Sequence, residues 1–464
     1  MHLRWARRQL PAAVVSTLVL ISASKADTLN TEAAPKGETF TYGVDAGVAE
    51  SDNVALVSTG KVSQTIALAD VDFDLKQKSR LLDVDAKGDF TYLDYLQGAY
   101  NNQVIGRFDG GAHVALIPER LTWTLTDDFG QAALDPFTPV TPANLENVNY
   151  VSTGPDLALR LGATSFINAS ARYARADYQT SPFNSNRLLG NLAWGLQLSA
   201  QSSVSLNGDT ERVLFDNTVL NSDFDRTSGF ARYEVHGARS DISADLGATT
   251  IAQNGTSTTG GLARLQLTRK VSAAAKLTLS AGRELTDAST SFSNLQGGAL
   301  GVIGTAPAAQ TANNYTADYA SAGWQYQRYR TTISVSGRWE RDIYDGVPLL
   351  DNTRSGAEFR VARRLTHALT ADVQGRIYKT DYVHSLAAAG AGSANYDDQL
   401  IAAGLTWRHG RGLEVRLRAE HSARVTTGTF GYRENRALLT VGYRPSLRPD
   451  IDPDAYSSGP TAAY

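Results

Sequence analysis

The stretch Leu82-Asp83-Val84-Asp85-Ala86-Lys87-Gly88-Asp89-Phe90-Thr91-Tyr92 alternates, residue by residue, between apolar or small side chains and polar ones. Successive side chains of a β-strand point to opposite faces, so this segment has one apolar face and one charged face. The same alternation occurs in residues 39–49 and 413–420, and helical spacing fits none of the three segments. All three therefore predict strands that separate an apolar from a polar environment.

Segments of this kind recur along the chain, starting near residues 39, 65, 81, 104, 120, 156, 166, 187, 203, 228, 240, 260, 275, 317, 331, 355, 368, 399, 412 and 435. They are longer than the strands of five or six residues that are common in soluble proteins, and a tilted membrane strand needs about 9 to 11. The connections alternate between short turns and longer loops, the longest being 130–150, 286–314 and 382–396. This pattern is typical of outer-membrane barrels. It predicts an all-β fold, a single transmembrane antiparallel up-and-down β-barrel of about 18–20 strands, with short periplasmic turns and long extracellular loops.

Proline and tryptophan positions support this prediction. Proline cannot donate to a strand ladder, and the 14 prolines fall outside the expected strand interiors, with Pro155 close to a strand start. Five tryptophans have the apolar parity that membrane-interface girdles require: Trp123, Trp194, Trp324, Trp339 and Trp407. A soluble all-β fold is the alternative, but its core aromatics would need a second layer, and the sequence offers no amphipathic helices to provide one.

The first 26 residues have the pattern of a secretory signal. Arg4, Arg7 and Arg8 precede the mostly apolar stretch 11–23, and Ser24-Lys25-Ala26 places small residues before a cleavage site. The apolar run is shorter than the roughly 20 residues of a membrane anchor, which is the alternative interpretation. We therefore expect a cleaved signal peptide (1–26), a short N-terminal periplasmic segment (27–38), the barrel (39–446) and a disordered periplasmic tail (447–464), located in the outer membrane of a Gram-negative cell.

Composition and motifs exclude several classes of function. The chain has no cysteine, and its formal net charge of −3 gives no polybasic footprint for nucleic acid. No catalytic motif, metal cluster or cofactor motif is recognisable, so we expect no enzyme and no cofactor. Asp109 and His113 share the polar face, which is more typical of a pore wall than of catalysis. His421 and Ser422 are adjacent in sequence and so face opposite sides of a strand.

The polar face is expected to line the lumen. Only residues 27–38 precede the first strand, too few for a plug domain, so we expect a lumen that is open or narrowed only by its own loops. Residues 39–128 hold 14 acidic and 7 basic residues (net −7), and residues 328–446 hold 12 acidic and 18 basic residues (net +6). This asymmetry predicts either a transverse field suited to polar solutes or a solvated wall with paired charges. The candidate pore-lining residues are Asp70, Asp72, Asp74, Asp83, Asp85, Asp109, His113, Arg338, Arg360, Arg376, Arg408, Arg416 and Arg418.

One loop resembles a known family. The segment Asp135-Pro136-Phe137-Thr138-Pro139-Val140-Thr141-Pro142-Ala143-Asn144, followed by Glu146-Asn147-Val148-Asn149 and Ser152-Thr153-Gly154-Pro155-Asp156, resembles proteobacterial outer-membrane β-barrel proteins encoded with exopolysaccharide or exosortase (PEP-CTERM) gene clusters. Residues 45–54 and 223–226 are similar to the same family. The resemblance implies a barrel through which, or beside which, a secreted polysaccharide crosses the outer membrane, and it implies no catalytic residues.

Three functions are therefore expected, in this order. The first is a porin-like conduit for polysaccharide export, the second a general or small-solute diffusion porin, and the third a non-conducting barrel that serves as a structural anchor or adhesin. The expected partners are outer-membrane lipid, a polysaccharide or other polar solute, the barrel-assembly machinery and periplasmic export components. Most such barrels end on an aromatic residue, whereas here about twenty residues follow Tyr443. The signal for assembly is therefore expected within Leu439-Thr440-Val441-Gly442-Tyr443.

Overall fold

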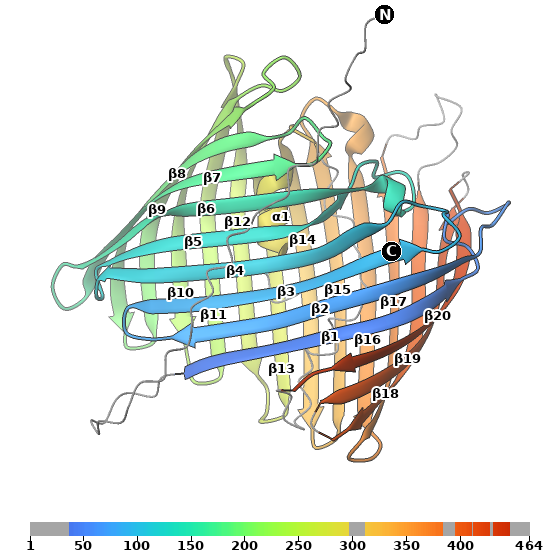
Figure 1. The fold of residues 1–464 in the computed structure, drawn as a ribbon. Helices are drawn as coiled ribbons and strands as arrows, with labels where there is room; N and C mark the ends of the chain where they lie inside the picture. Colours follow the sequence, from blue (N-terminus) through green and yellow to red (C-terminus); the bar gives the residue numbers. More distant parts are fainter. Residues whose placement is uncertain (1–36, 297–310, 384–394, 411, 427–429, 446–464) are drawn as a thin grey trace, which may run out of the picture. The chain divides into compact units, whose positions relative to one another are not determined.

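Twenty antiparallel strands pair in chain order, and the last pairs with the first, so the computed structural model is a closed barrel (Figure 1). The structure describes residues 37–296, 311–383, 395–410, 412–426 and 430–445. The strands are β1 (Gly37–Ser51), β2 (Gln64–Lys78), β3 (Leu82–Tyr95), β4 (Gln103–Ile117), β5 (Leu121–Ala133), β6 (Leu145–Arg160), β7 (Ser165–Tyr178), β8 (Ser185–Ser199), β9 (Ser202–Phe215), β10 (Phe224–His236), β11 (Ser240–Gln253), β12 (Thr256–Lys270), β13 (Ala275–Thr286), β14 (Tyr315–Arg328), β15 (Thr331–Tyr344), β16 (Asn352–Arg364), β17 (Leu369–Tyr382), β18 (Tyr396–His409), β19 (Leu413–Thr426) and β20 (Tyr432–Tyr443). The helical elements are η1 (Pro142–Asn144), α1 (Ala288–Gln296) and η2 (Pro348–Leu350).

Alternation in sequence becomes alternation between the two faces of the barrel wall. In β18, Ile401, Leu405 and Trp407 are exposed, whereas Ala402 and Thr406 between them are buried. The exposed set recurs on every side of the barrel as large apolar side chains, which therefore form its outer face. The opposite parity carries the charged and hydroxyl side chains and faces inward. The predicted class, an all-β closed antiparallel barrel, is confirmed, and its strand number is at the upper end of the predicted range.

The two rims of the barrel differ in the length of their connections. Even-numbered strands are followed by short turns, and odd-numbered strands by longer loops. The connection between β11 and β12 is an exception, since only Asn254 and Gly255 join these strands. Both residues have positive φ (51° and 76°), as a two-residue hairpin turn of type I′ requires. We call the rim with the longer connections the loop rim and the other the turn rim.

The largest departure from the predicted strands is in β6. The expected start of this strand is near residue 156, after a loop over 130–150, but β5 continues to Ala133 and β6 begins at Leu145. Pro155 therefore lies inside a strand, contrary to its predicted position. The ladder to β7 skips Gly154 and Pro155, and Arg172 of β7 donates to the carbonyl oxygen of Pro155 (2.9 Å). Gly154 has a φ of 157°, and a Cβ there would lie 2.0 Å from the carbonyl oxygen of Ala171, so only glycine fits.

Several predictions fall outside the described residues. These are the signal peptide (1–26), the tail (447–464) and parts of the predicted loops 286–314 and 382–396. Of the predicted N-terminal segment 27–38, Gly37 and Glu38 are described, and both belong to β1. In the part of the chain that the structure describes, no helix has the length and apolar character needed to cross a membrane.

Candidate functional site

The inner wall contains all the residues that the sequence analysis assigned to the lumen. On the acidic side these are Asp70, Asp72 and Asp74 of β2, Asp83 and Asp85 of β3, and Asp109 and His113 of β4. On the basic side they are Arg338 of β15, Arg360 of β16, Arg376 of β17, Arg408 of β18, and Arg416 and Arg418 of β19. Residues that lie directly opposite each other on neighbouring strands share a face of the wall. The strand register therefore shows which residues of each strand face the lumen.

The acidic wall runs over β1 to β5 with few basic companions. Lys87 of β3 lies opposite Asp109 of β4, which in turn lies opposite Asp128 of β5. Asp128 adds a further carboxylate that the predicted set did not include. Asp85 is exposed toward the interior of the barrel. This part of the wall therefore presents an excess of negative charge to the lumen.

The basic wall runs over β15 to β20, where arginines alternate with carboxylates in an ion-pair network. Arg418 spans the glycine position on β18 to reach Asp372 of β17 (3.4 Å) and also pairs with Glu420 (2.7 Å). Arg416 and Arg408 share Glu414 at 2.5 and 2.7 Å. Arginines outnumber carboxylates on the inward positions of these strands, so the wall is net positive although many of its charges are paired.

The two walls meet where β20 closes on β1. Arg444, directly after β20, pairs with Asp45 of β1 (2.7 Å) and with Asp72 of β2. The acidic and basic segments are therefore neighbours in the structure, and Arg444 and Asp45, which join them, were not among the predicted pore-lining residues. Their parity and charge were visible in the sequence, whereas the register that brings them together was not.

A helix folds back from the loop rim into the barrel. Asp287 follows β13 and caps α1, accepting hydrogen bonds from the backbone amides of Ser289 (3.1 Å) and Thr290 (3.2 Å). The helix contacts β5 and β6, far from β13 in strand order, and in Figure 1 it is seen behind those strands. It therefore occupies part of the lumen near the loop rim.

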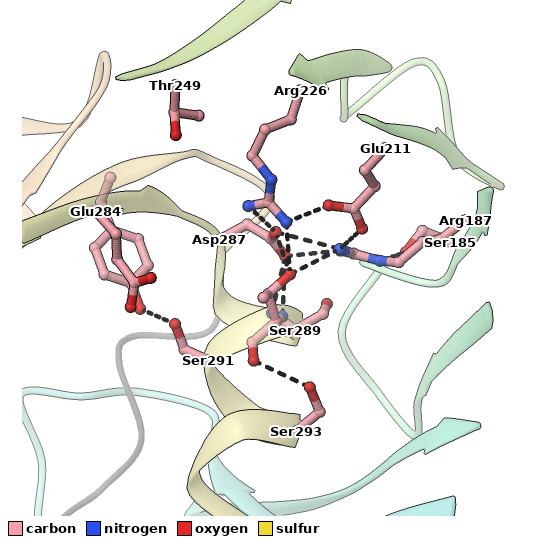
Figure 2. Close-up of polar contacts among 12 residues, drawn as sticks. Ser185, Arg187, Glu211, Arg226, Thr249, Glu284, Asp287, Ser289, Ser291 and Ser293 are labelled. Carbon is pink, nitrogen blue, oxygen red and sulfur yellow. Dashed lines mark hydrogen bonds and ion pairs between the residues drawn. The ribbon is translucent and has the colours of Figure 1, made fainter. Parts of the chain in front are cut away.

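Four buried charges fix the start of α1 to the inner wall (Figure 2). Arg187 of β8 donates to both oxygens of Asp287 (2.7 and 3.2 Å) and to Glu211 of β9 (3.0 Å). Arg226 of β10 donates to Asp287 (3.1 Å) and to Glu211. Burial alone would raise the pKa of Asp287, but the two guanidinium groups hold it well below its usual range. Two positive and two negative charges thus balance each other in a nearly dry environment.

Apolar packing holds the rest of the helix. Phe292 of α1 is buried against small and aromatic inward side chains of three strands, which are Ala132 of β5, Val148 and Tyr150 of β6, and Ala174, Ala176 and Tyr178 of β7. Burying a side chain of this size contributes about 1.5–3 kcal/mol. At the other side of the helix, the hydroxyls of Ser291 and Tyr315 of β14 share a hydrogen bond (2.5 Å). This helix was not predicted from the sequence, although the small alanine side chains at inward positions of β5 and β7 leave room for it.

A second segment crosses the loop rim. We call residues 134–144, between β5 and β6, the mouth strap. The Asn144 side chain donates to the carbonyl oxygen of Asp135 (2.9 Å) and to Thr138 (2.9 Å), and it accepts from the Asp135 amide (2.8 Å), so the strap is folded around this amide group. The ring of Phe137 lies 4.8 Å from that of Tyr382, whose hydroxyl donates to the carbonyl oxygen of Pro136 (3.3 Å).

A row of polar side chains crosses the acidic wall near the turn rim. His113 shares a hydrogen bond with Thr124 of β5 (3.0 Å), Thr124 donates to Asp156 of β6 (2.5 Å), and Arg172 of β7 binds the same carboxylate at 2.5 and 2.6 Å. Asp156 is therefore neutralised by an arginine and is held in the wall. His113 and Asp109, which share the polar face of β4, each lie opposite a residue of β5, and the hydrogen-bond partner of His113 is Thr124.

Together these features define a class: a closed antiparallel barrel whose apolar side chains face outward and whose charged interior is narrowed by two segments from one rim. The sequence matches no family model and no curated protein. Among solved structures it is similar to the FrpB iron transporter from Neisseria meningitidis (F3-3 variant), at 10% identity and a TM-score of 0.45, over 87% of this chain and 81% of that one. It is also similar to the copper transporter OprC (12%, 0.42, 89% and 81%) and to the outer membrane protein opdK from Pseudomonas aeruginosa (10%, 0.36, 87% and 97%).

Proposed function

We propose that this protein is an outer-membrane channel that conducts polar solutes through a lumen narrowed at its loop rim. The observation that carries the proposal is the separation of faces, with large apolar side chains outside and ionised ones inside a closed barrel. A barrel has no unpaired edge, so all its strands can cross a bilayer with their backbone groups satisfied. A charged interior wall is then accessible to water and to hydrophilic solutes.

The outer face supports residence in a membrane. Its exposed residues include large aliphatic side chains on nearly every strand, such as Leu192, Leu246 and Ile401. A continuous apolar belt of this extent is not stable against water. Trp123, Trp194, Trp324 and Trp407 face outward near the turn rim, where a girdle at the membrane interface is expected, and Trp339 lies nearer the loop rim.

The size of the barrel supports conduction. Twenty strands about 4.8 Å apart and tilted by about 40° enclose a backbone cylinder roughly 40 Å across. Helix α1, with a diameter of about 10–12 Å including side chains, occupies only part of this cross-section. The acidic and basic walls, which adjoin where β20 pairs with β1, lie on the inner face and produce a field inside the pore that acts on charged and dipolar solutes.

For the transported substance, the first candidate is a secreted polysaccharide. It is supported by the resemblance of the segment 135–156 to barrel proteins of exopolysaccharide gene clusters. Sugar hydroxyls can bind to the carboxylates, amides and guanidinium groups of such a wall. The second candidate is a small hydrophilic solute, which is favoured by the mouth strap and α1, since both narrow the entrance to the lumen.

Planar-bilayer recordings of the purified protein test the proposal. We expect stepwise conductance, and block by the producing cell's own polymer would identify polysaccharide as the transported substance. Swelling of liposomes that depends on solute size but is insensitive to the polymer would assign the small-solute function. If the lumen is closed, no conductance is measured and trimming of the loops abolishes partner binding, the protein is an anchor or adhesin and not a channel. Normal polymer secretion by a deletion strain would contradict the export function.

A further inference from the structure

Three carboxylates meet on the inner wall where the barrel closes. Asp45 of β1 lies directly opposite Asp70 of β2, and Asp72 is the next inward residue of β2. One oxygen of each carboxylate lies within 4.8 Å of one oxygen of the other two. All three side chains belong to the acidic wall, and two of them are buried, Asp45 being 3% and Asp70 1% exposed, whereas Asp72 is half-buried.

The charge of this cluster is not balanced by protein groups. Asp45 and Asp70 form a like-charge pair directly across two strands, an arrangement that destabilises a sheet. Arg444 pairs with Asp45 and Asp72 but is shared with Glu414 of β19 (3.6 Å), and Arg416, which also faces the cluster, is itself paired with Glu414 (2.5 Å). The carboxylates of this group outnumber the guanidinium groups beside them, which leaves negative charge for a cation.

The carboxylate of Asp89 is adjacent but has its own counter-charge. It lies opposite Asp72 on β3, and on its other side it lies opposite Arg107 of β4. Asp89 also contacts the side chain of Asp70, and Arg107 provides the positive charge nearest to it on β4.

An unpartnered oxygen provides a second, independent observation. Oδ1 of Asp70 accepts a hydrogen bond from Thr91 of β3 (2.6 Å), whereas no N–H or O–H group of the described residues donates to the buried Oδ2, and the neighbouring side chain of Asp89 is a second carboxylate. Thr440 of β20, diagonally across β1, is 2% exposed, and its hydroxyl also lacks a partner within that part of the chain. Buried oxygens of this kind are costly unless a ligand completes their coordination.

The backbone beside the cluster leaves room for the carboxylates. Two of the inward positions next to Asp45 are glycines, Gly43 before it and Gly442 across the ladder. A Cβ at Gly442 would lie 1.7 Å from Oδ1 of Asp45, and one at Gly43 would lie 2.7 Å from Oδ1 of Asp72. Any other residue would therefore displace the carboxylates from each other.

We propose that Asp45, Asp70 and Asp72 bind a hard divalent cation, Ca²⁺, on the inner wall at the closing strands. Carboxylate oxygens select hard cations, and oxygens that share one Ca²⁺ at 2.3–2.6 Å lie at most about 5 Å apart. The variable geometry of Ca²⁺ suits ligands fixed on rigid strands better than the octahedron of Mg²⁺. The ion joins β1 to β2 beside Arg444, where β20 pairs with only the Val44–Ser51 part of β1.

Equilibrium dialysis of the detergent-purified whole protein against radiolabelled Ca²⁺, after treatment with a chelator, tests the site. We expect one saturable ion per chain and a loss of affinity of roughly tenfold or more in Asp70→Asn. Asp85→Asn makes the same charge change on the same wall outside the cluster and is expected to bind as the unaltered protein does. Arg444→Gln increases the negative charge and is expected to raise the affinity.

Thermal unfolding supplies the second readout. Ca²⁺ is expected to raise the melting temperature of the unaltered protein but not that of Asp70→Asn, which without Ca²⁺ should be the more stable of the two because one repulsive charge is gone. If Asp70→Asn does not fold, Asp72→Asn provides the same comparison. Absence of saturable binding in the unaltered protein, or equal loss in Asp85→Asn, overturns the proposal. Conductance is measured separately, so failure of the cation site and failure of the channel function are distinguishable.

Discussion

The ring of Phe137, in the mouth strap between β5 and β6, lies 4.8 Å from the ring of Tyr382 at the end of β17. In either direction around the wall, many strands separate these elements. The contact can therefore be made only across the mouth of the barrel, and it makes the strap a fixed obstacle at the loop rim. Narrowing by the strap and narrowing by α1 can be tested independently because their anchoring residues do not overlap.

Removing the aromatic contact of the strap is expected to widen the entrance. Phe137→Ala deletes the ring that packs on Tyr382, a contact worth about 0.5–1.5 kcal/mol beyond its buried area. We expect a larger single-channel conductance and faster liposome swelling with bulky sugars. Val219→Ala, in an exposed loop residue of the same rim, serves as control and should leave both measurements unchanged. Equal conductance of the two variants would show that the strap does not limit flow.

Releasing α1 from the wall is expected to destabilise the folded protein more than loss of the Phe137 contact does. Asp287→Asn removes the partner of two buried arginines and should lower the free energy of unfolding by about 3–5 kcal/mol, because Arg187 is left with one carboxylate in a dry environment. Asp216→Asn breaks an exposed pair with Arg175 and should cost at most about 1 kcal/mol. Urea unfolding in detergent or lipid compares them, and similar costs would contradict the role of the buried network.

The ionisation of Asp287 is expected to make the conductance depend on pH in the acid range. The pKa of Asp287 in the folded protein is held below its unfolded value of about 3.9. Its stabilising contribution is therefore complete above that value and is lost only as the pH falls through the lower folded pKa. Conductance should be steady from neutral pH down to about 4 and rise below it as α1 is released. Asp287→Asn should be more conductive at neutral pH and lack this acid step, whereas a step near pH 6 would assign the response to another group.

Ion selectivity should follow the two walls. Arg376→Gln removes positive charge from the inward face of β17 and should shift the reversal potential toward cation selectivity in a salt gradient. Asp74→Asn, on the acidic wall, should shift it toward anion selectivity. Arg341→Gln changes an exposed residue on the outer face of β15 and should have no effect. Shifts of the same sign in the first two variants would contradict the separation of charge.

Local chemistry determined the barrel itself. Alternation with a period of two decides which side chains can face lipid and which must face water, and this pattern can be read in any single strand, such as residues 82–92. It predicted the strand number, the alternation of turns and loops, and the inward position of the charged residues. It failed at β6, where Gly154 and Pro155 interrupt the pairing with β7 inside a strand that the propensity rules would end.

Only the closed tertiary structure decided which distant residues meet. Arg187, Glu211, Arg226 and Asp287 belong to three strands and a loop, and their contacts depend on the register of the whole ladder and on the inward fold of α1. Likewise, Asp45 meets Arg444 only because β20 pairs with β1. A strand's own sequence fixes the face of each side chain, since that follows from backbone geometry. Contacts between distant strands arise because the barrel closes. Closure depends on the pairing of all the strands, so it cannot be read from the sequence of any one of them.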